Sequence, residues 1–402
     1  MGKYIRLVET CGYVEGENGA MLLDLKNKKA YHIEMEESKA LKQLLEGKNI
    51  QESVGNNKKL QEFVSQLIKK KLGKEEDTWR PSEKIHKGSL YELHPELRIN
   101  MNNIFVELPG DCYENCELCG ENQINGCFSC KIASDKVEYN KNFYYRLLSE
   151  ITNYNFRNIF LYGGNLFLNE DIIIDILEYT KRLLVAKEAR IFLICRDKHI
   201  SKKVTPILKK FNVIPIVGFD CRENASKDFW ESFQKTLDII GENMWCVNLQ
   251  MSSKTIKNFL PLKLILLEKY NIQDVVVTMS LHKNDEKIEY FSLLPKLTCD
   301  ETSFSIIEKI HPCLAGTLAI SATGEVFPCP CIKEKIGCIN YKRGATFSRI
   351  FDNKEKIMNF WGYSVEKIES CKRCEYRKTC SDCRAYDFNC GDLDTKRICA
   401  KS

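Results

Sequence analysis

The sequence predicts an α/β protein built on a parallel β-sheet. Between residues 104 and 278, short apolar segments alternate with segments whose apolar residues recur at helical spacing, and strands joined by crossover helices form parallel sheets. The strand-like segments are almost continuously apolar, as expected for strands covered on both faces. A chain of 402 residues allows two or three domains. We expect domains at 1–85, 98–295 and 296–402.

The first 85 residues contain strand-like segments followed by helical ones. Strands are predicted at 4–8, 20–25 and 30–33, and the last two flank a polar turn, which indicates a hairpin. Apolar residues at helical spacing predict helices at 37–45 and 60–68, with a short one near Gln51. Charged residues make 74–84 a predicted linker.

The central region supplies the strands and helices of the predicted parallel sheet. Strands are expected at 104–108, 158–162, 190–194, 213–217, 246–250 and 274–278. Helices are expected at 143–154, 172–184, 203–211, 229–240 and 256–270. Ligands of such sheets bind at the carboxyl ends of the strands. A cysteine-rich loop follows the first strand and is therefore expected at that edge.

That loop carries a C-x3-C-x2-C motif formed by Cys112, Cys116 and Cys119. Three thiolates on one short loop can hold three corners of a [4Fe–4S] cluster, which leaves the fourth iron open to a small molecule. Electron-transfer clusters held by four cysteines have no such vacancy. Cys127 and Cys130 form a further C-x2-C pair; they could stabilise the loop, bind an extra metal or act as alternative ligands.

The chain contains 20 cysteines, and no apolar run resembles a signal peptide or reaches the ~18 residues of a membrane span. We therefore expect a cytoplasmic protein with no membrane partner, in which clustered cysteines bind metal. The alternative, a secreted disulfide scaffold, suits much shorter chains. The net charge of +5, from 60 basic and 55 acidic residues, does not suggest a nucleic-acid partner.

Two further motifs contain residues suited to ligand or metal binding. The strand at 158–162 runs into Gly163, Gly164 and Asn165, and paired glycines allow positive φ or close backbone approach to a ligand. The C-terminal third contains C-x10-G-x4-C, predicted as a strand, a turn at Gly324 and a return strand. A C-x2-C-x5-C-x2-C motif follows. Structural zinc is the alternative for such pairs.

Together these motifs resemble the radical S-adenosylmethionine (radical SAM) maturases of ribosomally made peptides that carry a SPASM extension. The resemblance implies a partial (β/α)6 barrel in which Cys112, Cys116 and Cys119 hold a [4Fe–4S] cluster that chelates SAM. It implies that Gly163, Gly164 and Asn165 bind SAM. The order of elements in 1–85 resembles the winged-helix-like leader-recognition domain of these systems. There a precursor peptide adds a strand to a sheet edge, expected here near 29–33 and facing the helix at 60–72.

The SPASM resemblance implies two auxiliary [4Fe–4S] clusters. One is assigned to Cys371, Cys374, Cys380 and Cys399. The other is assigned to Cys313, Cys329 and Cys383, with its fourth ligand open among Cys299, Cys331 and Cys338.

The resemblance implies an enzyme that forms a 5′-deoxyadenosyl radical and modifies a precursor peptide, as a thioether, a carbon–carbon crosslink or an epimer. An external one-electron donor, ferredoxin or flavodoxin, would be a partner. Asn165 stands where the family usually has an acid, Leu118 where it has an aromatic residue, and Cys380 and Cys383 are one residue closer than usual. Two alternatives stay open: a cluster-bearing peptide-binding protein without SAM cleavage, and a sulfatase-type formylglycine maturase.

Overall fold

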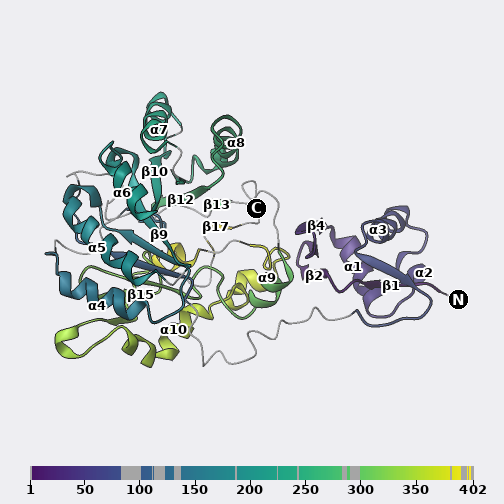
Figure 1. Ribbon diagram of the computed structural model, residues 1–402. Helices are drawn as coiled ribbons and strands as arrows, with labels where there is room; N and C mark the ends of the chain where they lie inside the picture. The colour runs from purple at the N-terminus through teal and green to yellow at the C-terminus, as the bar shows by residue number, and fades with distance from the viewer. Residues whose placement is uncertain are drawn as a thin grey trace.

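The structure is a computed structural model of the chain. It describes residues 2–82, 101–110, 112, 123–130, 137–185, 188–223, 225–241, 244–282, 288–289, 299–380, 383–390, 396 and 398–399. A small N-terminal body and a larger body around a long β-sheet are evident in Figure 1. No helix in the described part of the chain is long and apolar enough to cross a membrane.

The N-terminal body consists of short strands and three helices. Its strands are β1 (Tyr4–Leu7), β2 (Cys11–Gly16), β3 (Gly19–Asp24), β4 (Lys29–Ile33) and β5 (Gly73–Glu76). Its helices are α1 (Met35–Leu45), α2 (Ile50–Val54) and α3 (Lys58–Lys69). Strands β2, β3 and β4 form an antiparallel sheet in that order, so β4 has an open edge within the sheet. Strands β1 and β5 pair separately.

Local signals in the sequence explain where these helices begin and which face they bury. The Asn57 side chain accepts hydrogen bonds from the backbone N–H groups at the start of α3, as expected of an N-cap. The buried residues of α3 are Leu60, Phe63, Val64 and Leu67, a spacing that forms one apolar stripe. This stripe packs in one core with residues of α1, β1 and β3.

The larger body contains six parallel strands that follow one another in sequence order. They are β6 (Asn103–Glu107), β8 (Asn158–Tyr162), β9 (Arg190–Arg196), β10 (Ile214–Asp220), β11 (Cys246–Met251) and β12 (Val275–His282). The helices between them are α4 (Lys141–Ile151), α5 (Glu170–Leu183), α6 (Val204–Phe211), α7 (Lys227–Ile240) and α8 (Phe259–Tyr270). The predicted α/β class with a large parallel sheet is confirmed.

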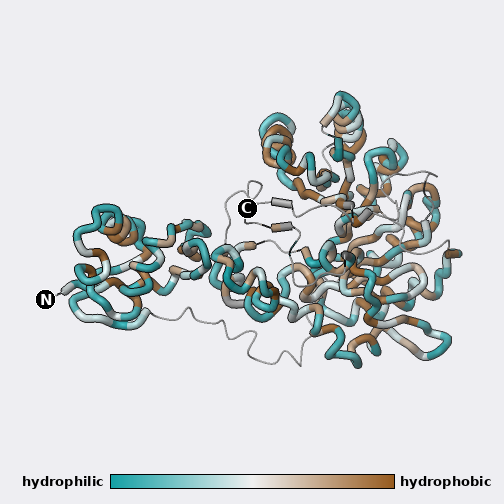
Figure 2. Tube along the Cα trace, turned by 180° about the vertical axis from the view of Figure 1, so that it is seen from behind, coloured by the Kyte–Doolittle hydropathy of each residue, from teal (hydrophilic) through white to brown (hydrophobic). Residues whose placement is uncertain are grey.

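Sequential strand order places all the crossover helices on one face, because such connections are right-handed. Alternate strand residues on that face, such as Leu161, Leu193 and Leu249, belong to the main core together with residues of the helices. Figure 2 shows hydrophobic stretches along the strands and on the inward sides of the helices. The opposite face carries a second cluster that includes Phe105 and Phe160. This second face, which lacks the crossover helices, is called here the open face.

Segments from outside the six-strand unit extend the sheet at both edges. Strand β14 (Thr317–Ile320) pairs parallel to β6 and is followed by β15 (Glu325–Phe327) and β16 (Gly337–Cys338). The predicted strand–turn–strand around Gly324 is confirmed, with φ of +84° at that glycine. At the other edge, β7 (Gln123–Asn125) pairs antiparallel to β12.

The cysteine-rich C-terminal region is mostly irregular. Its short elements are β13 (Ile288–Glu289), α9 (Glu301–Ile306), α10 (Lys354–Trp361), α11 (Glu369–Lys372), α12 (Arg384–Cys390) and β17 (Ile398–Cys399). Strands β13 and β17 pair with each other.

The two bodies meet where the β2–β3 turn packs against residues 373–377, called here the docking loop. Glu17 N donates a hydrogen bond to Arg373 O at 2.9 Å, and Arg377 Nη1 donates to Glu15 O at 2.6 Å. The Tyr376 ring stacks on the ring of His32 of β4, with centroids 5.7 Å apart. The docking loop contains Cys374, the second cysteine of the C-x2-C-x5-C-x2-C motif, and ends three residues before the third, Cys380.

Candidate active site at the carboxyl ends of the strands

The turn after β8 packs backbone to backbone on the segment that leads to the first cysteine of the triplet. Gly163 and Gly164 have φ of +140° and +67°, so the predicted positive φ is confirmed. A Cβ atom on Gly163 would lie 2.2 Å from Leu108 O, and one on Gly110 would lie 1.8 Å from Gly163 O. Glycine is therefore required at these positions by the protein's own backbone. Cys112 lies two residues beyond Gly110.

Asn165 is almost completely buried beside this turn. Its side chain is 4 % exposed, and its Oδ1 accepts a hydrogen bond from Phe167 N at 3.2 Å, which caps the 3-10 turn Leu166–Asn169. An amide oxygen has two lone pairs, so Oδ1 keeps the capacity to accept a second hydrogen bond. Cys112 is half-buried. Cys116, Leu118 and Cys119 lie outside the described residues.

A polar zone occupies the open face near the carboxyl ends of the strands. Arg196 of β9 and Asn248 of β11 both pair with Gly218 of β10, and parallel partners share a face. A Cβ atom on Gly218 would lie 3.2 Å from Gln250 Nε2 and 3.5 Å from Arg196 Cδ. Both side chains therefore pass over this glycine.

Two buried acceptor atoms of the polar zone, Asn248 Oδ1 and Gln250 Oε1, have no hydrogen-bond partner within the described residues. Arg196 Nε and Asp197 Oδ1 make no hydrogen bond but lie 3.6 Å apart as an ion pair. An unsatisfied buried polar group costs about 1–3 kcal/mol, so a concentration of them indicates a place for a polar ligand. Sequence reasoning missed these residues. The available signal was a polar residue near the end of an otherwise apolar strand segment.

The loop after β7 crosses the open face next to both features. Asn248 Nδ2 donates a hydrogen bond to Phe128 O at 3.0 Å, and Gly164 N donates to Cys130 O at 2.8 Å. The Phe128 ring lies against Phe160, with centroids 5.8 Å apart. The segment of residues 123–130, called here the loop 123–130, includes β7 and connects the Gly163–Gly164 turn to the polar zone.

His199, just beyond β9, provides a pH-dependent prediction. Burial, followed by the charge of Arg196, lowers the pKa of His199 to about 4 from its usual value near ~6.5. The unfolded chain therefore binds more protons than the folded chain between these pH values. The free energy of unfolding should fall as pH drops through that window, by at most about 3 kcal/mol. Urea denaturation at pH 7 and pH 4.5 should show a smaller loss in His199→Gln. Equal losses would contradict this origin.

Five cysteine thiols gather where the C-terminal region meets the loop 123–130. Burial, followed by the charges of Cys313 and Cys329, raises the pKa of Cys127 well above its usual range. Burial, followed by the charges of Cys313, Cys127 and Cys329, does the same for Cys383. The pKa of Cys331 is raised by a hydrogen bond to Cys329, by burial and by the charges of Cys329, Cys127 and Cys383. The predicted set Cys313, Cys329 and Cys383 is thus within mutual electrostatic reach.

The three cysteines left open as the fourth ligand occupy different places. Cys331 lies beside Cys329. Cys299 belongs to the core under the N-terminal sheet, with Tyr376. Cys338 pairs with Glu325 at the sheet edge. Cys331 is therefore the one of the three that these contacts place beside the predicted set.

The other predicted cluster involves Cys374, which lies in the docking loop, and cysteines on either side of the loop. Cys371 lies in α11, and Cys374 N donates a hydrogen bond to Cys371 O at 3.0 Å, so this C-x2-C pair shares one turn. Lys396, 5 % exposed, has its Nζ 2.9 Å from Cys380 Sγ. Cys399 ends β17. The assignment of these four to one cluster stays a prediction.

The donor set consists of cysteine thiols, which bind both iron–sulfur clusters and zinc. No disulfide joins the cysteines whose side chains are described. Among the described residues, no three Cys, His, Asp or Glu side chains converge on a single metal ion. Tetrahedral zinc needs four ligands within about 2.3 Å of one atom, whereas a cubane distributes its cysteines over four irons. A loose group of thiols is compatible with a cubane.

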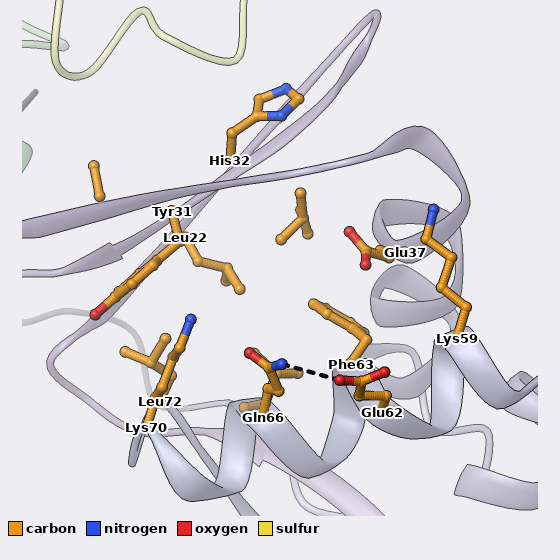
Figure 3. A pocket seen from close by; sticks show the side chains of 13 residues that line it. Leu22, Tyr31, His32, Glu37, Lys59, Glu62, Phe63, Gln66, Lys70 and Leu72 are labelled. Carbon is orange, nitrogen blue, oxygen red and sulfur yellow. Dashed lines mark hydrogen bonds between the residues drawn. The ribbon is translucent and has the colours of Figure 1, made fainter.

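A separate groove lies on the N-terminal body between β4 and α3. Its volume is about 560 Å³ and it includes apolar Phe63 and Leu67 together with charged Lys59 and Lys70. In Figure 3 the Tyr31 side chain is on the α3 side of β4, whereas the His32 ring is on the opposite side. The predicted open strand edge facing the third helix is present at this groove.

Comparisons with known proteins give likenesses of overall shape. No protein-family model and no curated protein matches the sequence. The structure of this chain is similar to that of Streptococcus suis SuiB bound to S-adenosylmethionine, at 10 % identity and a TM-score of 0.48, over 99 % of this chain and 100 % of that one. It is also similar to SuiB bound to the precursor peptide SuiA, at 10 % identity and a TM-score of 0.45, over 98 % of this chain and 99 % of that one. A third similar structure is that of anSMEcpe with bound AdoMet, at 12 % identity and a TM-score of 0.49, over 74 % of this chain and 89 % of that one.

Proposed function

We propose that this protein is a radical SAM enzyme that modifies a ribosomally made precursor peptide. One observation carries the proposal. The Gly163–Gly164 turn packs against the segment leading to Cys112, at the carboxyl edge of six parallel strands. Beside it are the Asn248 and Gln250 side-chain oxygens, which have no hydrogen-bond partner within the described residues. The motif spacing and the fold support the proposal that an iron–sulfur loop lies next to a ligand-binding turn.

In this proposal the chain's own residues bind and orient SAM. Cys112, Cys116 and Cys119 would hold the [4Fe–4S] cluster. The Gly163–Gly164 backbone would flank SAM, and the second lone pair of Asn165 Oδ1 would accept a hydrogen bond from its amino group. Reductive cleavage of SAM at such a centre, with an electron from ferredoxin or flavodoxin, supplies a 5′-deoxyadenosyl radical. The polar zone would position the peptide residue that loses a hydrogen atom.

The groove on the N-terminal body would bind the leader of the precursor peptide. An extended peptide could add a strand to the open edge of β4, because that edge has no partner in the three-stranded sheet. Phe63 and Leu67 offer apolar contacts. The charged side chains of the groove are of both signs, Lys59 and Lys70 with Glu37 and Glu62. The chemistry and the leader binding would thus belong to different bodies.

Asn165→Asp tests the proposed role of this residue in binding SAM. Aspartate keeps the oxygen that caps the 3-10 turn through Phe167 N and adds a charge for the SAM ammonium. The change should tighten SAM binding by on the order of 1 kcal/mol. Asn165→Ala should weaken SAM binding and remove the cap. Isothermal titration with SAM measures both effects, and tighter binding by the alanine variant would contradict the assignment.

The cluster load is the second prediction about the cofactors. Anaerobic reconstitution should give three [4Fe–4S] clusters, about twelve irons and twelve sulfides per chain. Simultaneous replacement of Cys112, Cys116 and Cys119 by alanine should remove about four of each. Colorimetric iron and sulfide assays measure the load. Stoichiometric zinc without acid-labile sulfide would contradict it.

The deciding experiment is SAM cleavage by the reconstituted protein. With dithionite and its cognate peptide, the protein should release 5′-deoxyadenosine and shift the peptide mass. Three bound clusters without 5′-deoxyadenosine would instead favour a cluster-bearing peptide-binding protein, the alternative that Asn165 and Leu118 support. Conversion of a Cys- or Ser-containing sulfatase peptide to formylglycine would identify a sulfatase-type maturase. A short open reading frame beside the gene would supply the cognate peptide sequence.

A further inference from the structure

We propose that Cys127 is the fourth ligand of the auxiliary cluster held by Cys313, Cys329 and Cys383. One cluster would then be ligated jointly by the loop 123–130, which follows the barrel's first strand, and by the C-terminal region. The inference rests on the proposed function, because it presumes that the C-terminal cysteines hold iron–sulfur clusters. It adds a ligand from a part of the chain to which the motif resemblance assigns none.

Backbone contacts place the Cys127 loop beside the element that begins after Cys383. Gly126 N donates a hydrogen bond to Met279 O at 3.2 Å, and the Tyr386 hydroxyl of α12 donates to the same carbonyl. A Cβ atom on Gly126 would lie 3.3 Å from the Tyr386 hydroxyl oxygen. The residues next to Cys127 and near Cys383 are therefore anchored at one point of β12.

The C-x-C segment that contains Cys329 contacts the same helix. Asn389 Nδ2 of α12 donates a hydrogen bond to Cys331 O at 2.6 Å. Phe327, two residues before Cys329, packs in the open-face cluster together with Cys127. Three segments far apart in sequence thus bring their cysteines to one region.

The contacts distinguish Cys127 from Cys331 as the fourth ligand. Cys331 follows Cys329 by one residue on the same segment, and its backbone oxygen is hydrogen-bonded to Asn389 of α12. Cys127 comes from a separate segment, which is anchored on β12 beside Tyr386 of α12. A cubane needs each thiolate at a separate corner. A thiol from a separate segment can approach a corner that the Cys329 segment does not occupy.

Iron and sulfide analysis of alanine variants tests this assignment. The full chain is reconstituted anaerobically as wild type, Cys127→Ala, Cys331→Ala and Cys130→Ala, and iron, sulfide and the EPR spectrum of the reduced protein are measured. Cys130 is the matched control, because it is a buried thiol three residues away on the same loop. In Cys127→Ala we expect loss of about four irons, or conversion of one cluster to a three-iron form. Cys331→Ala and Cys130→Ala should match the wild type.

Cys127→Ser provides a second measurement should the alanine variant fail to fold. A serine oxygen differs from a thiolate as an iron ligand, so the reduction potential of one cluster should shift while the other signals stay unchanged. Wild-type iron, sulfide and potentials in both Cys127 variants would overturn the inference. Cluster loss in Cys331→Ala instead would overturn it too and would assign the ligand to Cys331. A wild type that binds no sulfide would refute the proposed function itself.

Discussion

Cys116→Ala is expected to abolish formation of 5′-deoxyadenosine by the reconstituted protein. The triplet has three cysteines for three irons, so loss of the middle one removes a ligand that no neighbouring residue of the motif replaces. Without the cluster, SAM has neither an iron to chelate nor an electron source. The measurement is 5′-deoxyadenosine by liquid chromatography after incubation with SAM, dithionite and the cognate peptide.

The control for this experiment is Cys246→Ala. Cys246 is a buried thiol at the start of β11, and its burial, followed by the charge of Asp274, raises its pKa to about 12. It is therefore an inert thiol in the interior, and its loss should leave the SAM chemistry in place. Residual 5′-deoxyadenosine in Cys116→Ala at the wild-type level would show that the triplet is not the SAM-binding centre.

Gln66→Trp is expected to weaken leader-peptide binding at least tenfold, or by about 1.4 kcal/mol. Gln66 lies on the groove side of α3, where its Nε2 approaches Glu62 Oε1 at 3.4 Å (Figure 3). An indole at this position would occupy the space that a strand added to β4 needs. Fluorescence anisotropy with the labelled leader of the cognate peptide measures the affinity. SAM cleavage without peptide should be unchanged, because it belongs to the other body.

Ser65→Trp is the matched control for the groove variant. Ser65 is exposed on the same helix, one residue earlier, and is not among the residues that line the groove. The same substitution there should leave peptide affinity within twofold of the wild type. Equal effects of the two tryptophans would point to a change in the helix, and no effect of either would remove the groove from the proposal.

The regular elements could be predicted where local pattern and tertiary environment agree. Strand β8 coincides with the predicted segment 158–162, since a buried parallel strand is apolar throughout. Strand β5 was predicted as part of a linker, because Gly73-Lys-Glu-Glu76 is almost entirely charged. It forms a strand through pairing with β1, where Arg6 Nε lies 3.0 Å from Glu76 Oε1. Context of this kind overrides strand propensity.

Strand pairings between residues far apart in the sequence could not be predicted. Strand β2 contains Gly12 and Gly16 and was not predicted. Strand β7 has three residues, too few for a periodic signal. The parallel pairing of β14 with β6 joins residues more than 200 positions apart, such as Leu318 and Ile104. The same kind of non-local contact brings Cys127 to the C-terminal cysteines. Motif spacing groups residues that are near in sequence and gives no information on such a partner.

The docking loop can couple metal binding in the C-terminal region to ligand binding in the groove of the N-terminal body. Its backbone is bonded to the β2–β3 turn, and Tyr376 stacks on His32, which belongs to the same strand whose edge borders the groove. The cysteines on either side of it would change their positions on taking up metal. If metal loading changes the affinity of the groove for its ligand through this loop, ligand binding must change the affinity for metal by the same factor, because coupling between sites is reciprocal. Under the proposed function, peptide affinity would therefore report metal occupancy in the C-terminal region, and it could be measured without any turnover.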